Sequence, residues 1–331
     1  MNAFLVDGVR TPVGNFGGTL ASIRTDDLAA LTISELLKRN SSLDPAMVGD
    51  VILGCANQAG EDNRNVARMA SLLAGLPVSV PGETVNRLCA SGLASAVNGS
   101  RMLALGDADL VIAGGVENMT RGPWVMSKAS KAFGRDSSLY DTSFGWRFIN
   151  PKLEAVYGVD GMGVTAENLV DKYSISREDQ DAFAFRSHMK AAAARDAGRL
   201  AQEIIPVNIP RRKQDDLIFE HDEFIKPDTT VEILAKLRPA FRKEGGSVTA
   251  GNSSGLNDGS AALLLANESG LTSSGLTPLA QIISSAVVGV EPRIMGIGPV
   301  RASEMALKKA GITFNDLDVI ELNEAFSAQA L

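Results

Sequence analysis

The chain has 331 residues, 45% of them hydrophobic, which is enough for one large or two medium domains with well-filled cores. Its formal net charge of −7 lacks the bulk positive charge that attracts nucleic acid or an anionic membrane. Two cysteines provide no disulfide framework, no apolar run is long enough to cross a bilayer, and the first residues resemble a strand rather than a signal peptide. These features predict a cytoplasmic protein with no nucleic-acid or membrane partner.

The first 118 residues alternate short apolar runs with helical patterns. Strands are expected at residues 3–6, 50–53 and 109–113, and helices at 25–37, 63–74 and 90–105. Thr25 is the expected cap of the first helix, with Asp26 and Asp27 in its first turn. This alternation predicts an α/β fold with a mainly parallel sheet that is covered on both faces.

The sequence changes character after residue 118. Residues 119–157 are irregular and contain both tryptophans, whereas Ser176 to Gly198 is a strong helical pattern that opens with a possible capping box of Ser176 and Asp179. We expect residues 119–249 to form a loop-rich domain inserted into the first sheet.

The remaining residues predict a second half. A small, polar run at 248–255 is suited either to close ligand approach or to a linker, and it precedes an apolar strand at 261–266. Further on, 315–323 repeats the pattern of 48–56, which indicates an internal duplication. The expected division is therefore residues 1–118 plus 250–268 as the first half, 119–249 as the insertion, and 269–331 as the start of a second half.

Cys89 is the main candidate for chemistry. It lies between an extended run, Thr84 to Leu88, and a helical pattern at 90–105. Unpaired N–H groups at a helix start favour a negative charge, and the thiolate is the nucleophilic form of cysteine. The helix would turn these residues inward: Leu93, Ala96, Val97, Ser100, Leu103 and Ala104. An ordinary buried cysteine is an equally good interpretation of position alone, and Cys55 is most simply a packing residue at a strand end.

Several motifs resemble those of the thiolase family. Asn86 to Gly92 resembles the nucleophile motif, Asn323 to Phe326 the Asn-Glu-Ala-Phe motif, and Gly251 to Gly259 the pantetheine-binding loop. The matches extend along the chain and include residues 10–12, 114–119 and 161–168. Residues 54–64 and 145–151 resemble the 3-oxoadipyl-CoA thiolases in particular.

The resemblance implies thiolase-like duplicated βαβ sheets with an inserted loop domain, and a homodimer or homotetramer. It implies cleavage of a 3-oxoacyl-CoA by CoA, or the reverse Claisen condensation, with CoA as a substrate and with no other cofactor and no metal. Cys89 would carry the acyl group as a thioester, and Asn323 would fix a water that stabilises the oxyanion. Ala250 and Ser254 would contact pantetheine, Lys226 would lie near the CoA nucleotide, and the acyl pocket would be walled by Met162, Ala325 and Phe326.

Two departures from the family pattern qualify this interpretation. Gly161 stands where many biosynthetic thiolases have histidine, which fits a degradative or 3-oxoadipyl type better. The family continues to Gly-His-Pro and Cys-x-Gly motifs, whereas here no cysteine follows Cys89 and both histidines, His188 and His221, are expected at the surface. The expectation is a second half that is incomplete and a chain that is inactive alone.

Other classes of function remain as alternatives. A non-catalytic, truncated acyl-CoA-binding or partner subunit is the main one. A nicotinamide dehydrogenase is disfavoured because no Gly-x-Gly-x-x-Gly opens a helix after the first strand. A condensing enzyme that uses acyl carrier protein is disfavoured by the Asn-Glu-Ala-Phe motif and the 251–259 loop.

Overall fold

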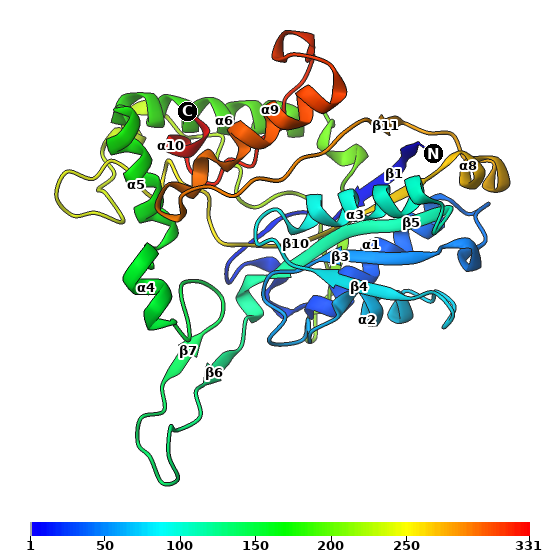
Figure 1. The fold of residues 1–331 in the computed structure, drawn as a ribbon, viewed down its shortest axis with the longest axis horizontal. Helices are drawn as coiled ribbons and strands as arrows, with labels where there is room; N and C mark the ends of the chain where they lie inside the picture. The colour runs from blue at the N-terminus through cyan, green and yellow to red at the C-terminus, as the bar shows by residue number, and fades with distance from the viewer. Residues whose placement is uncertain (1) are drawn as a thin grey trace.

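The computed structural model describes residues 2–331 and has a seven-stranded sheet at its centre (Figure 1). The sheet contains β1 Ala3–Arg10, β2 Gly14–Asn15, β3 Asp50–Gly54, β4 Gly82–Val85, β5 Leu110–Asn118, β10 Asn257–Ala266 and β11 Ala280–Ile282. The strand order is β11-β1-β10-β5-β3-β4, with β2 paired to the end of β10. The predicted α/β class is confirmed.

The sheet is mixed rather than mainly parallel, so that part of the prediction is wrong. β3 pairs in parallel with β4 and β5, as strand–helix–strand units require. β10 lies between β1 and β5 and is antiparallel to both. The insertion between β5 and β10 returns the chain to the same end of the sheet at which β5 stops, since Asp258 near the start of β10 pairs with Asn118 at the end of β5.

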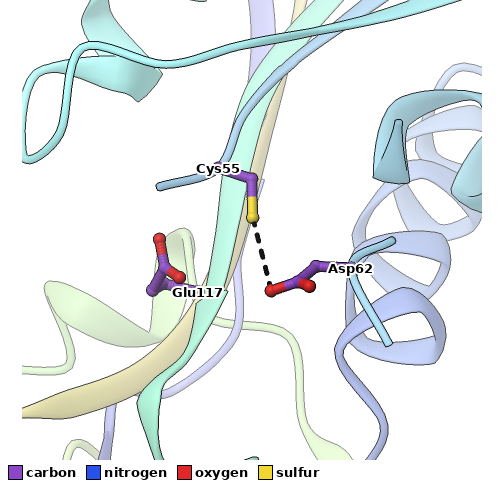
Figure 2. Close-up of side chains that lie close together, drawn as sticks. All are labelled: Cys55, Asp62 and Glu117. Atoms are coloured by element: carbon purple, nitrogen blue, oxygen red, sulfur yellow. Dashed lines mark hydrogen bonds between the residues drawn. The ribbon is translucent and has the colours of Figure 1, made fainter. Parts of the chain in front are cut away.

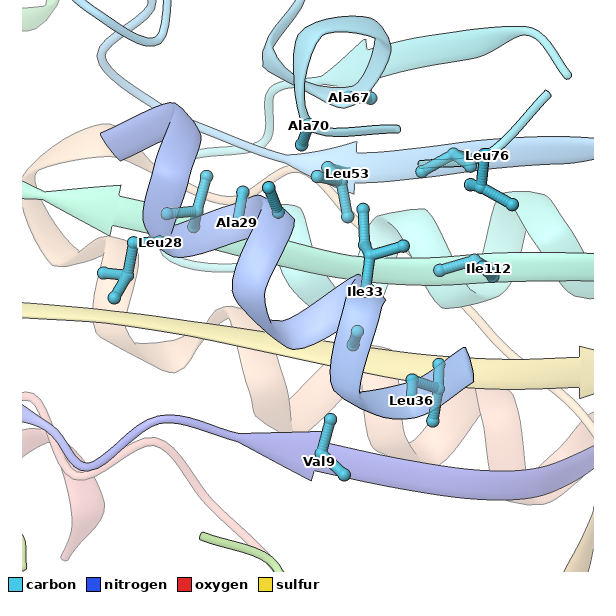
Figure 3. Close-up of a cluster of buried hydrophobic side chains, with 14 of the residues drawn as sticks. Val9, Leu28, Ala29, Ile33, Leu36, Leu53, Ala67, Ala70, Leu76 and Ile112 are labelled. Atoms are coloured by element: carbon cyan, nitrogen blue, oxygen red, sulfur yellow. The ribbon is translucent and has the colours of Figure 1, made fainter. Parts of the chain in front are cut away.

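Helices cover both faces of this sheet (Figure 1). Helices α1 (Thr25–Arg39) and α2 (Val66–Leu73) pack on one face, and α3 (Ser91–Leu105) packs on the other. Figure 3 shows the larger core, in which Leu28, Ile33 and Leu36 of α1 meet Leu53 and Ile112 of the sheet. Burial of these apolar side chains is the main favourable term that holds the layers together.

Helix α3 buries only Leu103 of the six side chains predicted to face inward. Its buried residues are Ser91, Ser95, Gly99 and Leu103, whereas Leu93 is 71% exposed. The contact is close because it is made by small residues: Ser95 Oγ accepts a hydrogen bond from Gly114 N–H of β5 at 3.0 Å. A pattern based on hydrophobicity misses an inner face that is formed largely by serine and glycine.

The helix ends agree only in part with the predictions. Thr25 does not cap α1, because Arg24 occupies the N-cap position and Thr25 is the buried first residue. Ser176 is the N-cap of α6 (Arg177–Asp196), since its Oγ accepts the Asp179 N–H at 3.0 Å; the Asp179 carboxylate accepts the Ser176 hydroxyl at 2.7 Å rather than the Ser176 N–H that a capping box would use.

Residues 119–249 contain most of the other elements. These are β6 Trp124–Met126, β7 Leu139–Asp141, α4 Pro151–Tyr157, α5 Met162–Tyr173, α6, β8 Val207–Ile209, β9 Leu217–Phe219 and α7 Val231–Ala235. β6 and β7 form a hairpin that extends away from the main sheet (Figure 1). No helix among residues 2–331 has both the length and the apolar character needed to span a bilayer.

The residues after β10 form helices and one short strand. They are α8 Glu268–Ser274, β11, α9 Gly298–Ala310 and α10 Ser327–Ala330. Gly311 ends α9 with a φ of +73°, and β11 adds to the edge of the first sheet beside β1. Residues 317–324, where the internal repeat predicted a strand, are irregular and mostly exposed, because no neighbouring strand among the described residues pairs with them.

The end of β3 provides a test of the close contact with α3. A Cβ added at Gly54 would lie 2.3 Å from the Ser91 carbonyl carbon, and neither backbone can move away freely. Gly54→Ala should therefore destabilise the protein by about 1–3 kcal/mol, the usual effect of overpacking. Urea unfolding gives the measurement, and Gly289→Ala is the matched control because its Cβ would meet nothing within 4 Å. Equal stability of the two variants would contradict this contact.

Candidate functional site

Cys89 lies in a tight turn between β4 and α3. Leu88 adopts a φ of +50°, and its N–H donates to Asn86 Oδ1 at 2.9 Å. Ser91 Oγ closes the turn, since it accepts the Arg87 N–H at 2.8 Å and donates to the Leu88 carbonyl at 2.6 Å. Cys89 is exposed, so the interpretation of it as an ordinary buried cysteine is wrong.

The Cys89 turn is joined to the end of the neighbouring strand. Asn86 Nδ2 donates to the Ala56 carbonyl at 3.0 Å. The N–H groups of Ala56 and Asn57 in turn donate to the Glu117 carboxylate at 2.8 and 3.2 Å. Burial raises the pKa of Glu117, and these two N–H groups oppose that increase. The turn, the end of β3 and the end of β5 thus form one hydrogen-bonded edge of the sheet.

Behind this edge, three potential metal ligands lie within 4.8 Å of one another: Cys55, Asp62 and Glu117 (Figure 2). Burial, followed by the charges of Glu117 and Asp62, raises the pKa of the Cys55 thiol to about 12. The thiol donates to Asp62 Oδ2 at 3.8 Å. Asp62 Oδ1 accepts the Gly60 N–H at 2.8 Å, and Glu117 already holds two N–H groups. The geometry favours a buried hydrogen-bonded cluster, in agreement with the packing role predicted for Cys55.

A second part of the site is a small pocket of about 180 Å³ beside the 250–255 loop. This loop pairs with the Asn-Glu-Ala-Phe segment: Ser254 N–H donates to the Ala325 carbonyl, and Ser327 N–H to the Asn252 carbonyl, both at 2.9 Å. Ser254 and Ala250 are exposed, whereas Phe326 is 9% exposed and packs edge-on against Phe241 with ring centres 5.9 Å apart. The pocket is lined by Phe183, Ala184, Ser187, His188, Phe224, Gly251, Asn252, Ser253, Ser254, Glu324 and Ser327.

A buried carboxylate holds the strand-like start of this loop. Glu167 of α5 is fully buried and accepts the backbone N–H groups of Ser247 and Val248, each at 2.9 Å. Asn252 is held from the other side, because its Nδ2 donates to Asp181 of α6 at 2.9 Å. Sequence reasoning missed both carboxylates, although a charged residue among the apolar positions of a helix is a reason to look for buried partners.

Lys226 lies at the rim of the pocket. Its Nζ is 5.5 Å from the centre of the Phe224 ring, and its backbone N–H donates to His188 Nδ1 at 3.4 Å. His188 is partly buried, stacks on Phe224 and has a pKa that burial lowers, so the expectation of a plain surface residue is wrong for it. It was missed because the pocket is formed between α6 and residues far along the chain. His221 is exposed, as expected.

Met162 and Asn323 are the last two of the site residues predicted from the sequence. Met162 is the half-exposed first residue of α5, and the next residue, Gly163, lies against Phe241, which contacts Phe326. Asn323 is exposed, and its side chain makes no hydrogen bond with any described residue. The structure therefore brings Ser254, Ala325 and Phe326 together with Lys226 nearby, but it does not connect Asn323 to Cys89 by a hydrogen bond.

Comparison with known proteins gives matches along the chain. The family model described as thiolase, N-terminal domain, matches residues 3–269, and thiolase, C-terminal domain, matches residues 276–331. A 3-oxoadipyl-CoA/3-oxo-5,6-dehydrosuberyl-CoA thiolase of Escherichia coli is 55% identical over 99% of this chain and 82% of its own length. A beta-ketoadipyl-CoA thiolase of Acinetobacter baylyi is 54% identical over 100% of this chain and 82% of its length. The crystal structure of the Bacillus anthracis acetyl-CoA acetyltransferase superposes with a TM-score of 0.88 at 41% identity, over 99% of this chain and 81% of that one.

These matches do not confirm the expectation that the chain is a truncated protein, since the C-terminal domain model matches from residue 276 to residue 331. The boundary between the two domain models lies between residues 269 and 276.

The two cysteines should differ sharply in reactivity. Cys89 is exposed, whereas Cys55 is 1% exposed and has a thiol pKa of about 12. Iodoacetamide at pH 8 should therefore alkylate Cys89 in the folded protein and modify Cys55 only after unfolding in urea. Peptide mass spectrometry measures both sites, and equal rates in the folded protein would contradict this arrangement.

Glu167 should position the loop without contacting a ligand. Glutamine would retain one acceptor oxygen but direct an NH₂ group at backbone N–H donors, so Glu167→Gln should destabilise the protein by about 1–3 kcal/mol. It should also weaken binding of CoA. Urea unfolding and calorimetry measure the two effects, with the exposed Glu244→Gln as control. If both variants behave alike, the buried carboxylate does not support the loop.

Proposed function

The chain belongs to the thiolase family, and on that premise we propose that it cleaves a 3-oxoacyl-CoA with CoA or catalyses the reverse Claisen condensation. The acyl substrate that we propose is 3-oxoadipyl-CoA, because relatives 54–55% identical along the chain have names that specify this substrate class. The single structural observation that carries the proposal is the exposed thiol of Cys89 in a tight turn before a helix.

The reaction divides a difficult step into two easier ones. Cys89 Sγ attacks the 3-carbonyl carbon of the substrate, and the bond between C2 and C3 breaks. The acyl group remains on sulfur as a thioester, while the carbanion at C2 takes up the proton that the Cys89 thiol has lost and leaves as acetyl-CoA. The sulfur of CoA then loses its proton and attacks the thioester, the bond to Cys89 Sγ breaks, and the shortened acyl-CoA leaves as Cys89 regains a proton. Helix N–H groups beside the turn favour the negative charge that the sulfur carries in the first step.

The remaining residues of the proposed site bind the substrate. Ser254 and Ala250 contact pantetheine, and Lys226 lies near the CoA nucleotide; the exposure of all three at the pocket and its rim supports these roles. Met162, Ala325 and Phe326 form the wall of the acyl pocket, a role supported by the contact of Phe326 with Phe241 and of Phe241 with the start of α5. Asn323 fixes a water for the oxyanion, a role supported by its exposed side chain, which makes no hydrogen bond with any described residue.

We also propose a homodimer or homotetramer in the cytoplasm. Support for association comes from large apolar side chains that the β6–β7 hairpin exposes: Trp124 is 72% exposed and Met126 is 69% exposed. Exposed apolar patches of this kind are typical of protein–protein contacts.

The proposal predicts a covalent intermediate on one cysteine. Incubation with acetyl-CoA should acetylate Cys89; Cys89→Ser should lose both the adduct and thiolysis of 3-oxoadipyl-CoA, because the hydroxyl is a much weaker nucleophile. Intact-mass and peptide mass spectrometry measure the adduct, and Cys55→Ser is the control that should retain it.

An adduct on Cys55 in place of Cys89 would contradict the assignment. CoA-thioester binding without any adduct would favour the alternative of a non-catalytic acyl-CoA-binding or partner subunit.

A further inference from the structure

Arg147 is a partly buried cation that forms no ion pair among residues 2–331. Its side chain also makes no hydrogen bond within these residues. Most other arginines that are less than fully exposed are paired; Arg10, for example, forms ion pairs with Glu203 and Asp222. A partly desolvated, unpaired guanidinium is unfavourable unless it faces water or a ligand anion.

The backbone on both sides of Arg147 is anchored. Trp146 Nε1 donates to the Asp160 carbonyl at 3.3 Å, which fixes the segment beside the start of α5 and Met162. The Phe148 ring packs against Tyr140 of β7 with ring centres 4.8 Å apart. Arg147 is therefore held between the hairpin and the proposed wall of the acyl pocket.

The charge of Arg147 also acts on Glu117 at the end of β5. Burial raises the pKa of Glu117, and the positive charge of Arg147 is among the groups that lower it, which requires the two side chains to be near each other. Glu117 accepts the N–H of Ala56, and the Ala56 carbonyl accepts the side-chain amide of Asn86 in the Cys89 turn. The segment of Arg147 is thus anchored beside the start of α5, and its charge acts on the Glu117 carboxylate, which is hydrogen-bonded to the segment that holds the Cys89 turn.

Glu117 does not neutralise this cation by direct contact. Its two oxygens accept the backbone N–H groups of Ala56 and Asn57, and no ion pair joins it to Arg147 among the described residues. Asp62, the other carboxylate of this cluster, accepts from Gly60 and Cys55. Arg147 therefore retains its donors for a further carboxylate.

Two other arginines near the turn fit this role less well. Arg64 and Arg87 are both exposed, so water screens their charges. Arg64 nevertheless belongs to residues 54–64, which meet the Glu117 edge through Ala56 and Asn57, and it is the main competitor.

We propose that Arg147 binds the distal carboxylate of a dicarboxylic acyl-CoA and so selects this substrate class over neutral acyl chains of equal length. The inference rests on the proposed function, because it requires the acyl group to lie between Cys89 and Met162. In 3-oxoadipyl-CoA the carboxylate carbon is three bonds from the 3-carbonyl carbon that Cys89 attacks. A planar guanidinium can hold such a carboxylate with two parallel hydrogen bonds.

Binding of two unreactive ligands tests the proposal without any need for turnover. Adipyl-CoA and hexanoyl-CoA have equal chain lengths, and neither has the 3-oxo group that the reaction cleaves. Calorimetry on the full chain should show adipyl-CoA binding about 10-fold more tightly, the effect of one charge-assisted contact worth about 1.4 kcal/mol. The difference should shrink as salt is added.

Substitutions test whether Arg147 causes the preference for adipyl-CoA over hexanoyl-CoA. Arg147→Gln should remove the preference for adipyl-CoA while it leaves the Kd of hexanoyl-CoA unchanged, which also shows that the variant is folded. Arg147→Lys should retain part of the preference, because it retains the charge but not the paired donors. Lys152→Gln removes an equal charge from nearby α4 and should leave the preference intact.

The other outcomes contradict the assignment to Arg147, the selection of a carboxylate, or the proposed function. A preference that survives Arg147→Gln, or that disappears in Arg64→Gln instead, overturns the assignment to Arg147. Equal Kd values for the two ligands in the unchanged protein overturn the proposed selection of a carboxylate while the CoA-binding function stands. Failure of both ligands to bind contradicts the proposed function itself.

Discussion

The close approach of α3 to the sheet is the contact on which the rest of the site depends. Gly54 lets the end of β3 reach the Ser91 backbone, and Ser95 bonds directly to the backbone of Gly114. Larger side chains at these positions would lift the start of the helix and move the Cys89 turn away from the edge where β3 and β5 end. The position of Cys89 thus depends on the small residues where α3 meets the sheet, rather than on any strong attractive interaction.

One partly buried and one fully buried carboxylate hold the segments that surround this turn. The Glu117 carboxylate accepts backbone N–H groups of the residues after β3, and the Glu167 carboxylate accepts those of the residues before the 250–255 loop. In each case the carboxylate accepts N–H groups that have no partner in a helix or strand. These backbone donors are therefore hydrogen-bonded although they lie outside regular structure. This arrangement fixes loops that come from distant parts of the chain while their tips stay open to a ligand.

Of the substrate-binding residues expected from the motifs, only Ser254 is among those that line the pocket, but the sequence predicted the α/β class and the helix starts at Ser176 and after Cys89, because these depend on local patterns. It did not predict the inner face of α3, since Ser95 and Gly99 have no hydrophobic pattern. It also missed the antiparallel pairing of β10 and the place of His188 beside Phe224, because both depend on how the insertion at 119–249 returns to the sheet. The strand expected near residue 320 does not form for a similar reason. A strand needs a neighbouring strand to pair with, and a local sequence pattern does not provide one.

The position of β10 has a consequence for folding during synthesis. β10 lies between β1 and β5, and it pairs Phe4 with Ala266 and Leu110 with the same residue from the other side. The two earlier strands must wait for almost the whole described chain to leave the ribosome before this gap can be filled. Contacts so distant in sequence make folding slow, and the apolar faces of β1 and β5 need protection from aggregation in the interval. We therefore expect the growing chain to depend on chaperones until β10 has been made.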